Sequence, residues 1–171
     1  MIKPTCILGL DPGLGITGYG VLELRDRALV LREAGIIRCD PKQSLEKRLI
    51  ELHEGLTEVL ETHPCTALAI EQLYSHYDRP RTAILMGHAR GVLCLAAAQA
   101  GLAVHSYLPT KVKKMLTGNG RAPKSQMQLA VKQQLHLSKI PEPADVADAL
   151  AVALCHHFAS NSLNFHRGNI A

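Results

Sequence analysis

The stretch Thr5-Cys-Ile-Leu-Gly-Leu-Asp11, followed by Pro12-Gly-Leu-Gly15, decides the fold that this sequence is expected to adopt. A short apolar run that ends in a carboxylate is typical of a buried strand, and the Pro-Gly pair behind it predicts a tight turn. Residues 17–24 predict a second strand, and residues 27–38 carry the β-branched and aliphatic side chains of a third. Because the links are short, we expect an antiparallel meander.

An amphipathic helix is predicted after the meander. Ser44 is a suitable N-cap for a helix that ends near Thr62. Its apolar side chains recur at helical spacing; they are Leu45, Leu49, Leu52, Leu56, Val59 and Leu60. The next apolar run, Thr66 to Glu71, predicts a fourth strand. A helix of this length between strands indicates a right-handed crossover, so we expect this strand parallel to an earlier one, most simply beside the first.

The remaining chain alternates helices with one short strand and a glycine-rich loop at residues 118–124. The expected elements are a helix over residues 81–100, a strand over 103–107, a basic helix from Pro109, a helix capped by Ser125 that ends near 137, and a last helix, after Pro143, that ends near 160. This order predicts a single α/β domain over residues 1–160, with a flexible tail over residues 161–171.

Composition narrows the class of protein. With 171 residues, 47% of them hydrophobic, the chain is long enough for one well-filled core. Its most apolar region, residues 83–104, is interrupted by His88, Arg90 and Gln99, so we expect no membrane contact and a cytoplasmic protein. Five cysteines without a C-x-x-C spacing indicate neither a disulfide framework nor a zinc site, and most should be buried thiols.

Charge is segregated along the chain. Between Asp78 and Glu142 there is no acidic residue, and ten lysines and arginines give this segment a charge of +10, whereas the rest of the chain sums to −6. A basic face without acidic residues favours a polyanion such as nucleic acid as the partner. A solvated basic face without a partner is the alternative.

Four carboxylates form the candidate catalytic set. Asp11 and Glu71 each end an apolar strand, and parallel neighbouring strands would bring both to the same edge of the sheet. Asp145 and Asp148 are three residues apart on the last predicted helix and therefore share a face. Such a group resists full ionisation unless a divalent cation such as Mg²⁺ or Mn²⁺ neutralises it, which indicates in-line hydrolysis of a phosphodiester. Taken singly, each residue also has an ordinary interpretation as a turn, strand-end or helix-start residue.

The sequence resembles the RuvC-type Holliday junction resolvases of the RNase H-like superfamily over nearly its whole length, to about Phe158. The matching motifs are Leu8-Gly-Leu-Asp-Pro-Gly13 with Thr17-Gly-Tyr-Gly20, Ala69-Ile-Glu-Gln72, Gly87-His-Ala-Arg-Gly-Val92, Lys124-Ser-Gln126 and Ala144-Asp-Val-Ala-Asp-Ala-Leu-Ala151. The resemblance implies an RNase H-like α/β fold with a five-stranded mixed sheet, whose first three strands are antiparallel and last two parallel, flanked by helices. It further implies a homodimer that uses Mg²⁺, or Mn²⁺ in its place, to nick two like-polarity strands of four-way junction DNA, alongside a branch-migration helicase complex of the RuvA and RuvB type.

The resemblance also implies roles for individual residues. Asp11, Glu71, Asp145 and Asp148 match the family's catalytic and metal-binding carboxylates, and Lys113 and Lys124 match lysines used near the scissile phosphate. The neighbouring Lys114 and Arg121 are further candidate DNA contacts. Tyr74 stands where relatives carry a phenylalanine thought to stack on junction bases, and packing is the alternative for this ring. Residues 81–100, rich in alanine, are the candidate dimer interface, with core packing as the alternative.

Three other functions remain for comparison. An ATPase of the actin and sugar-kinase type needs a second domain for which this chain has no room, and the glycines of residues 13–18 lack the lysine of a Walker loop because Tyr19 stands at its position. A non-catalytic protein that binds branched DNA would not need four carboxylates. The third alternative is an RNase H-like nuclease that acts on RNA or on RNA–DNA hybrids.

Overall fold

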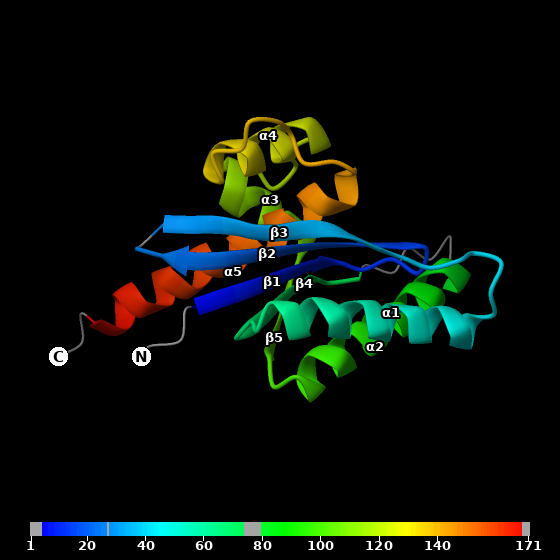
Figure 1. Cartoon of the computed structure of the whole chain (residues 1–171). Coiled ribbons are helices and arrows are strands. Elements are labelled where there is room, and N and C mark those ends of the chain that lie inside the picture. Colours follow the sequence, from blue (N-terminus) through cyan, green and yellow to red (C-terminus); the bar gives the residue numbers. More distant parts are fainter. Residues whose placement is uncertain (1–4, 27, 74–79, 169–171) are drawn as a thin grey trace.

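The computed structural model describes residues 5–26, 28–73 and 80–168, and a five-stranded mixed sheet forms its centre (Figure 1). The strand order is β3-β2-β1-β4-β5. The strands are β1 (Thr5–Asp11), β2 (Ile16–Arg25), β3 (Ala28–Arg38), β4 (Ala67–Glu71) and β5 (Ala103–Tyr107). The first three pair antiparallel, β4 lies parallel to β1, and β5 lies parallel to β4. The predicted meander is confirmed, and so is the predicted placement of the fourth strand parallel to the first and beside it.

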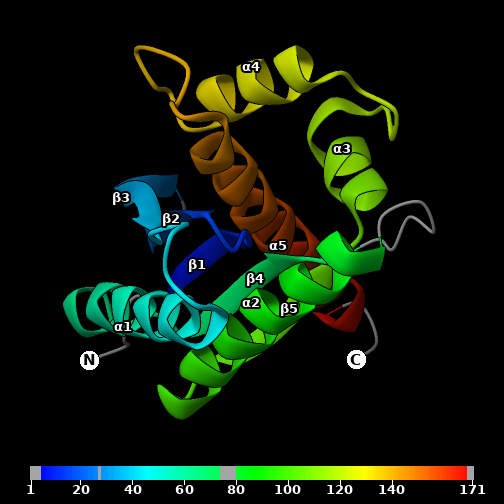
Figure 2. The same cartoon turned by 90° about the vertical axis from the view of Figure 1, so that its right-hand side faces the viewer.

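Helices cover both faces of this sheet (Figures 1 and 2). They are α1 (Leu45–Thr62), α2 (Pro80–Gln99), α3 (Pro109–Thr117), α4 (Lys124–Gln134) and α5 (Ala144–Gly168). One face packs against α1 and α2, and the other packs against α5, which is in turn covered by α3 and α4. Two apolar clusters, one on each face, therefore fix the layers.

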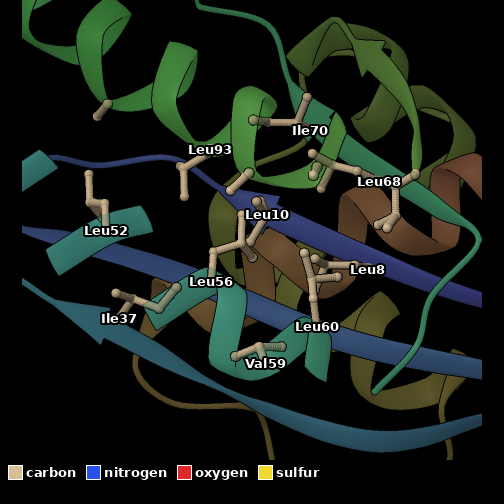
Figure 3. Close-up of a cluster of buried hydrophobic side chains, with 14 of the residues drawn as sticks. Leu8, Leu10, Ile37, Leu52, Leu56, Val59, Leu60, Leu68, Ile70 and Leu93 are labelled. Atoms are coloured by element: carbon tan, nitrogen blue, oxygen red, sulfur yellow. The ribbon is translucent and has the colours of Figure 1, made fainter. Parts of the chain in front are cut away.

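The cluster beneath α1 and α2 is built from the predicted apolar stripe (Figure 3). Leu52, Leu56, Val59 and Leu60 of α1 are buried against Leu8 and Leu10 of β1 and Leu68 and Ile70 of β4, with Leu93 of α2. Leu45 and Leu49 pack at the margin. The period of the sequence thus predicted which face of α1 is buried.

Three glycines let α5 approach the opposite face closely. A Cβ atom at Gly9 would overlap the Ala149 carbonyl oxygen, one at Gly18 would overlap that of Asp145, and one at Gly20 would overlap the Leu150 side chain. At Gly9 and Gly18, only a residue without a side chain allows this contact between helix backbone and strand backbone. The first turns of α5 therefore lie directly on β1 and β2.

The predicted bounds of two helices are wrong. Helix α4 begins at Lys124 with Pro123 at its N-cap, so Ser125 lies inside the helix, because an extended proline holds the chain out of helical geometry until the next residue. It ends at Gln134 rather than near 137, because His136 takes a left-handed φ of 52° and the Leu137 N–H donates back to Lys132.

Helix α5 ends at Gly168 rather than near Ser160, and no glycine or proline interrupts its sequence before that residue. The flexibility expected beyond residue 160 stays a prediction. Within the described residues, no helix combines the length and the apolar character that crossing a membrane requires.

Candidate active site

Two of the four carboxylates lie side by side at strand ends. In the parallel pair of β1 and β4, Leu10 is opposite Ile70, so the following residues, Asp11 and Glu71, are neighbours at the carboxyl edge of the sheet. Adjacent strands are about 4.8 Å apart, which sets the spacing of the two backbones. The sequence predicted this juxtaposition from the apolar runs that precede each residue.

The other two carboxylates come from the first turns of α5. Asp145 lies against Gly18, which pairs with Asp11 across β1 and β2. Asp148 follows one helical turn later and lines a cavity of about 220 Å³ together with Glu71, Lys113 and Lys124. The close approach of α5 thus carries its acidic face over the strand ends, as expected from the spacing of the two aspartates.

Two lysines from α3 and α4 form the basic wall of this cavity. Lys124 Nζ forms an ion pair with Asp148 Oδ2 at 2.9 Å. Lys113 lies close enough to Glu71 for its positive charge to favour the ionised carboxylate, which opposes the rise in the pKa of Glu71. Val112 and Met127, both buried in the apolar cluster with α5, fix these two helices to the site. The two lysines expected near the scissile phosphate thus both line the cavity with Glu71 and Asp148.

Electrostatics show that the carboxylates act on one another. Burial, and then the charges of Asp148, Glu71 and Asp145, raise the pKa of Asp11 to about 7, which the charge of Lys124 opposes. Burial and the charge of Asp148 also raise the pKa of Glu71, against the lysines. The hydrogen bond with Asp148 raises the pKa of Lys124. The lysines therefore do not offset the burial and mutual repulsion that raise the pKa values of Asp11 and Glu71.

The oxygen-rich donor set fits a hard divalent cation. Within the described part of the chain, no three His, Cys, Asp or Glu side chains are already gathered as a complete ligand cluster. Mutual repulsion between ionised carboxylates favours a wider spacing than a complete ligand cluster has. A neighbouring lysine offsets part of the negative charge, as Lys124 does for Asp148. The raised pKa of Asp11 indicates that added positive charge would stabilise the ionised site.

The remaining predicted contacts have different positions. Lys114 and Arg121 are exposed on α3 and on the loop before α4, outside the cavity wall. Tyr74 lies outside the described residues. Lys113, Lys114, Arg121 and Lys124 nevertheless all belong to the α3–α4 unit, which comprises these two helices and the loop between them, residues 109–134 (Figure 2).

Sequence reasoning missed one residue of this site. Arg90 of α2 donates from Nε to the backbone carbonyl of Glu71 at 3.3 Å and from a terminal nitrogen to Ser106 Oγ at 2.6 Å. It holds the ends of β4 and β5 together beside a carboxylate of the set. Its only signal was its place within Gly87-His-Ala-Arg-Gly-Val92, a motif that carried no assigned role.

The family model described as "Crossover junction endodeoxyribonuclease RuvC" matches residues 7–156, which span all of these site residues. The chain belongs to the RuvC family. A RuvC of Rhodopirellula baltica is 61% identical over 158 residues, which cover 92% of this chain and 89% of that relative. A RuvC of Caldicellulosiruptor saccharolyticus is 40% identical over 169 residues, with 96% and 99% covered.

Solved structures agree with the RuvC assignment. Thermus thermophilus RuvC superimposes with a TM-score of 0.85 at 32% identity, over 92% of this chain and 96% of that one. The same RuvC in complex with its Holliday junction substrate gives a TM-score of 0.84 at 29% identity, with the same coverage. The yeast mitochondrial resolvase Ydc2, at 10% identity and a TM-score of 0.60, shares the fold. The fold inferred from the motifs is confirmed.

Proposed function

We propose that this chain is a structure-specific endonuclease that resolves four-way DNA junctions by paired, symmetric nicks in strands of like polarity. The observation that carries the proposal is the placement of Asp11 and Glu71 at adjoining strand ends, beneath the acidic turn of α5 and beside Lys113 and Lys124. Carboxylates next to lysines suit a phosphodiester, because the acids bind cations and the lysines offset phosphate charge. The proposed unit is a single nuclease domain over residues 1–160.

Asp11, Glu71, Asp145 and Asp148 are the residues that would hold Mg²⁺, with Mn²⁺ as a substitute. A bound divalent ion supplies Lewis-acid stabilisation of the phosphate and lowers the pKa of a bound water. The chain itself fixes the two strand-end carboxylates rigidly through the β1–β4 pairing, and α5 fixes the others. Lys113 lies where it would stabilise charge that develops on the phosphate.

The α3–α4 unit would form the DNA-facing surface. Lys113 and Lys124 lie at the cavity, and Lys114 and Arg121 are exposed beyond it, so phosphates on either side of the cleaved bond would meet positive charge. Tyr74, three residues after Glu71, is proposed to stack on a base near the junction centre.

A homodimer formed through α2 suits a junction with two equivalent strands. On α2, Ile84 and Leu95 are 62% and 53% exposed. Gly87 and Gly91 lie between these two residues at helical spacing. A Cβ atom added at either glycine would meet no other atom within 4 Å, so contacts inside the chain do not require glycine there. An apolar face with two glycines allows close contact with a second helix. We further propose a cytoplasmic protein that works with a branch-migration complex of the RuvA and RuvB type.

The decisive experiment incubates a synthetic four-way junction with the protein, with and without Mg²⁺. We expect paired nicks only with the ion. Asp11→Asn should abolish cleavage and preserve junction binding, because it removes a metal ligand and lowers repulsion toward phosphate. Asp26→Asn, an exposed residue with a left-handed φ of 49° that asparagine also adopts, is the matched control and should cleave normally.

The outcomes separate the alternatives. Binding of junctions without nicks would favour a non-catalytic branched-DNA-binding protein. Faster cleavage of RNA–DNA hybrids than of junctions would favour a nuclease of the RNase H type. Equal affinity for branched and linear DNA would contradict junction specificity.

A further inference from the structure

Two cysteines meet at the end of β1 that lies opposite the carboxylates. Cys6 is the second residue of β1, and Cys65 lies in the link between α1 and β4. All five cysteines are free thiols, and the Cys6 and Cys65 sulfur atoms lie 3.0 Å apart although 59 positions separate them in sequence. A disulfide joins its sulfur atoms at about 2.05 Å, so closing this pair needs a movement of only about 1 Å.

The backbone holds the two residues in this position. The Thr66 N–H and the Thr66 hydroxyl both donate to the carbonyl oxygen of Cys6, at 2.9 Å and 3.0 Å. The residue next to Cys65 is therefore fixed to Cys6 itself, and small side-chain rotations suffice to bring the sulfur atoms together.

A small molecule from solvent can reach the pair. Cys6 lines a cavity of about 160 Å³ with Glu23, Arg32, Thr62, His63 and Pro64, and Cys65 is half-buried. The hydrogen bond between the two sulfur atoms lowers the pKa of Cys6, and Arg32 acts in the same direction, whereas burial and Glu23 oppose them. The same bond raises the pKa of Cys65. Cys6 is therefore the more readily ionised of the two, and the thiolate is the nucleophilic form of cysteine.

We propose that Cys6 and Cys65 form a reversible intramolecular disulfide when the protein meets a hydroperoxide. The Cys6 thiolate attacks one peroxide oxygen, the O–O bond breaks, and the alkoxide or hydroxide that leaves takes up a proton. The Cys65 sulfur then attacks the resulting sulfenic acid, the S–O bond breaks, and water leaves with the Cys65 proton. The two thiols lose two electrons, the peroxide gains them, and an added dithiol reverses the change.

The disulfide would join the start of β1 to the link before β4. A closed loop of this length constrains the unfolded chain, so oxidation should raise the melting temperature by on the order of 10 °C. Cleavage should change little, because Asp11 lies five residues along β1, roughly 16 Å away. The modification therefore acts on stability rather than on the carboxylate site.

The test uses the full chain, reduced and freed of reductant, then treated with hydrogen peroxide and alkylated. Before alkylation, the oxidised protein should be lighter than the reduced protein by two hydrogens. After unfolding and alkylation, the alkyl groups should be on Cys39, Cys94 and Cys155, and the peptide map should contain a Cys6–Cys65 cross-link. Cys65→Ser should instead leave a Cys6 sulfenic acid that dimedone labels. Cys94→Ser, which removes another half-buried thiol, is the matched control and should still form the cross-link.

Three results would overturn the proposal. They are alkylation of both Cys6 and Cys65 after peroxide treatment of folded protein, a cross-link that runs through Cys94, and a Cys65→Ser variant that dimedone does not label. Each is read on the folded wild-type chain or on a variant at a half-buried position, with circular dichroism as the check on folding.

Discussion

Arg90 of α2 donates a hydrogen bond to the backbone carbonyl of Glu71, so a helix proposed as the dimer interface also holds the backbone of a residue of the proposed metal site. The same guanidinium reaches Ser106 on β5 at 2.6 Å. The fork of donors spans the ends of two parallel strands, which lysine, with a single nitrogen, reproduces poorly. The proposed dimer interface and the proposed metal site therefore share one structural element.

We expect Arg90→Lys to lower Mn²⁺ affinity and the single-turnover cleavage rate by roughly 10- to 100-fold, as loss of a residue that orients a metal ligand typically does. Ser106→Ala removes one anchor and keeps the bond to Glu71, so its effect should be smaller. Electron paramagnetic resonance of bound Mn²⁺ gives a readout without DNA. Unchanged Mn²⁺ affinity in Arg90→Lys would show that the arginine only packs.

The Asp11→Asn variant should be more stable than the wild type at high pH in the absence of metal. Folding raises the pKa of Asp11 from 3.8 to about 7, which means that the folded state disfavours the ionised carboxylate. The free energy of unfolding of the wild type should therefore fall as the pH rises from the lower to the higher of these values. The gain on substitution should be near zero at about pH 4 and largest above pH 7, at most about 4 kcal/mol. Thermal melts from pH 5 to pH 8 measure it.

Mg²⁺ provides the control for that experiment. A bound ion stabilises the ionised wild type more than the variant, so the difference in melting temperature should shrink or reverse when Mg²⁺ is added. A gain that is independent of both pH and Mg²⁺ would contradict a shared charge at this site.

Lys113→Ala should weaken junction binding or slow nicking, and raised salt should reproduce the binding part of the loss. If Lys113 contacts a phosphate, the slope of log affinity against log salt should become shallower by about 0.9. Lys47→Ala removes an exposed lysine from α1, on the opposite side of the sheet, and should leave the slope unchanged. An equal effect of both variants would indicate a general charge effect.

Leu95→Asp should convert the proposed dimer to a monomer, which sedimentation velocity detects. Leu95 on α2 and Ile50 on α1 are 53% and 54% exposed, so Ile50→Asp is a closely matched control that should leave the oligomeric state unchanged. A charge inside an apolar interface loses hydration without gaining a partner. Persistence of the dimer in Leu95→Asp would place the interface elsewhere.

Gly18→Ala should destabilise the fold by about 1–3 kcal/mol and reduce cleavage, because its new Cβ would overlap the Asp145 carbonyl and displace the start of α5. Gly15→Ala adds the same methyl group where no other atom lies within 4 Å and should be nearly neutral. Urea denaturation of both variants tests the difference. Equal stabilities would mean that α5 can move away from β2 at little cost.

The sequence alone determined the layers of this protein and most of its candidate site. Local periodicity decides which face of α1 is buried, and an apolar run that stops at a carboxylate places Asp11 and Glu71 at strand ends. The i, i+3 spacing puts Asp145 and Asp148 on one helical face whatever the rest of the chain does. These features depend on residues close together in sequence, and therefore a pattern reveals them.

Only the tertiary structure decided how distant segments meet. The bond from Arg90 to Glu71 depends on how α2 packs against the end of β4. The Cys6–Cys65 contact likewise depends on the pairing of β1 with β4. The two cysteines have no C-x-x-C spacing that would indicate this contact from the sequence. Such contacts are set by the packing of whole elements, and packing geometry is not encoded in any short stretch of sequence.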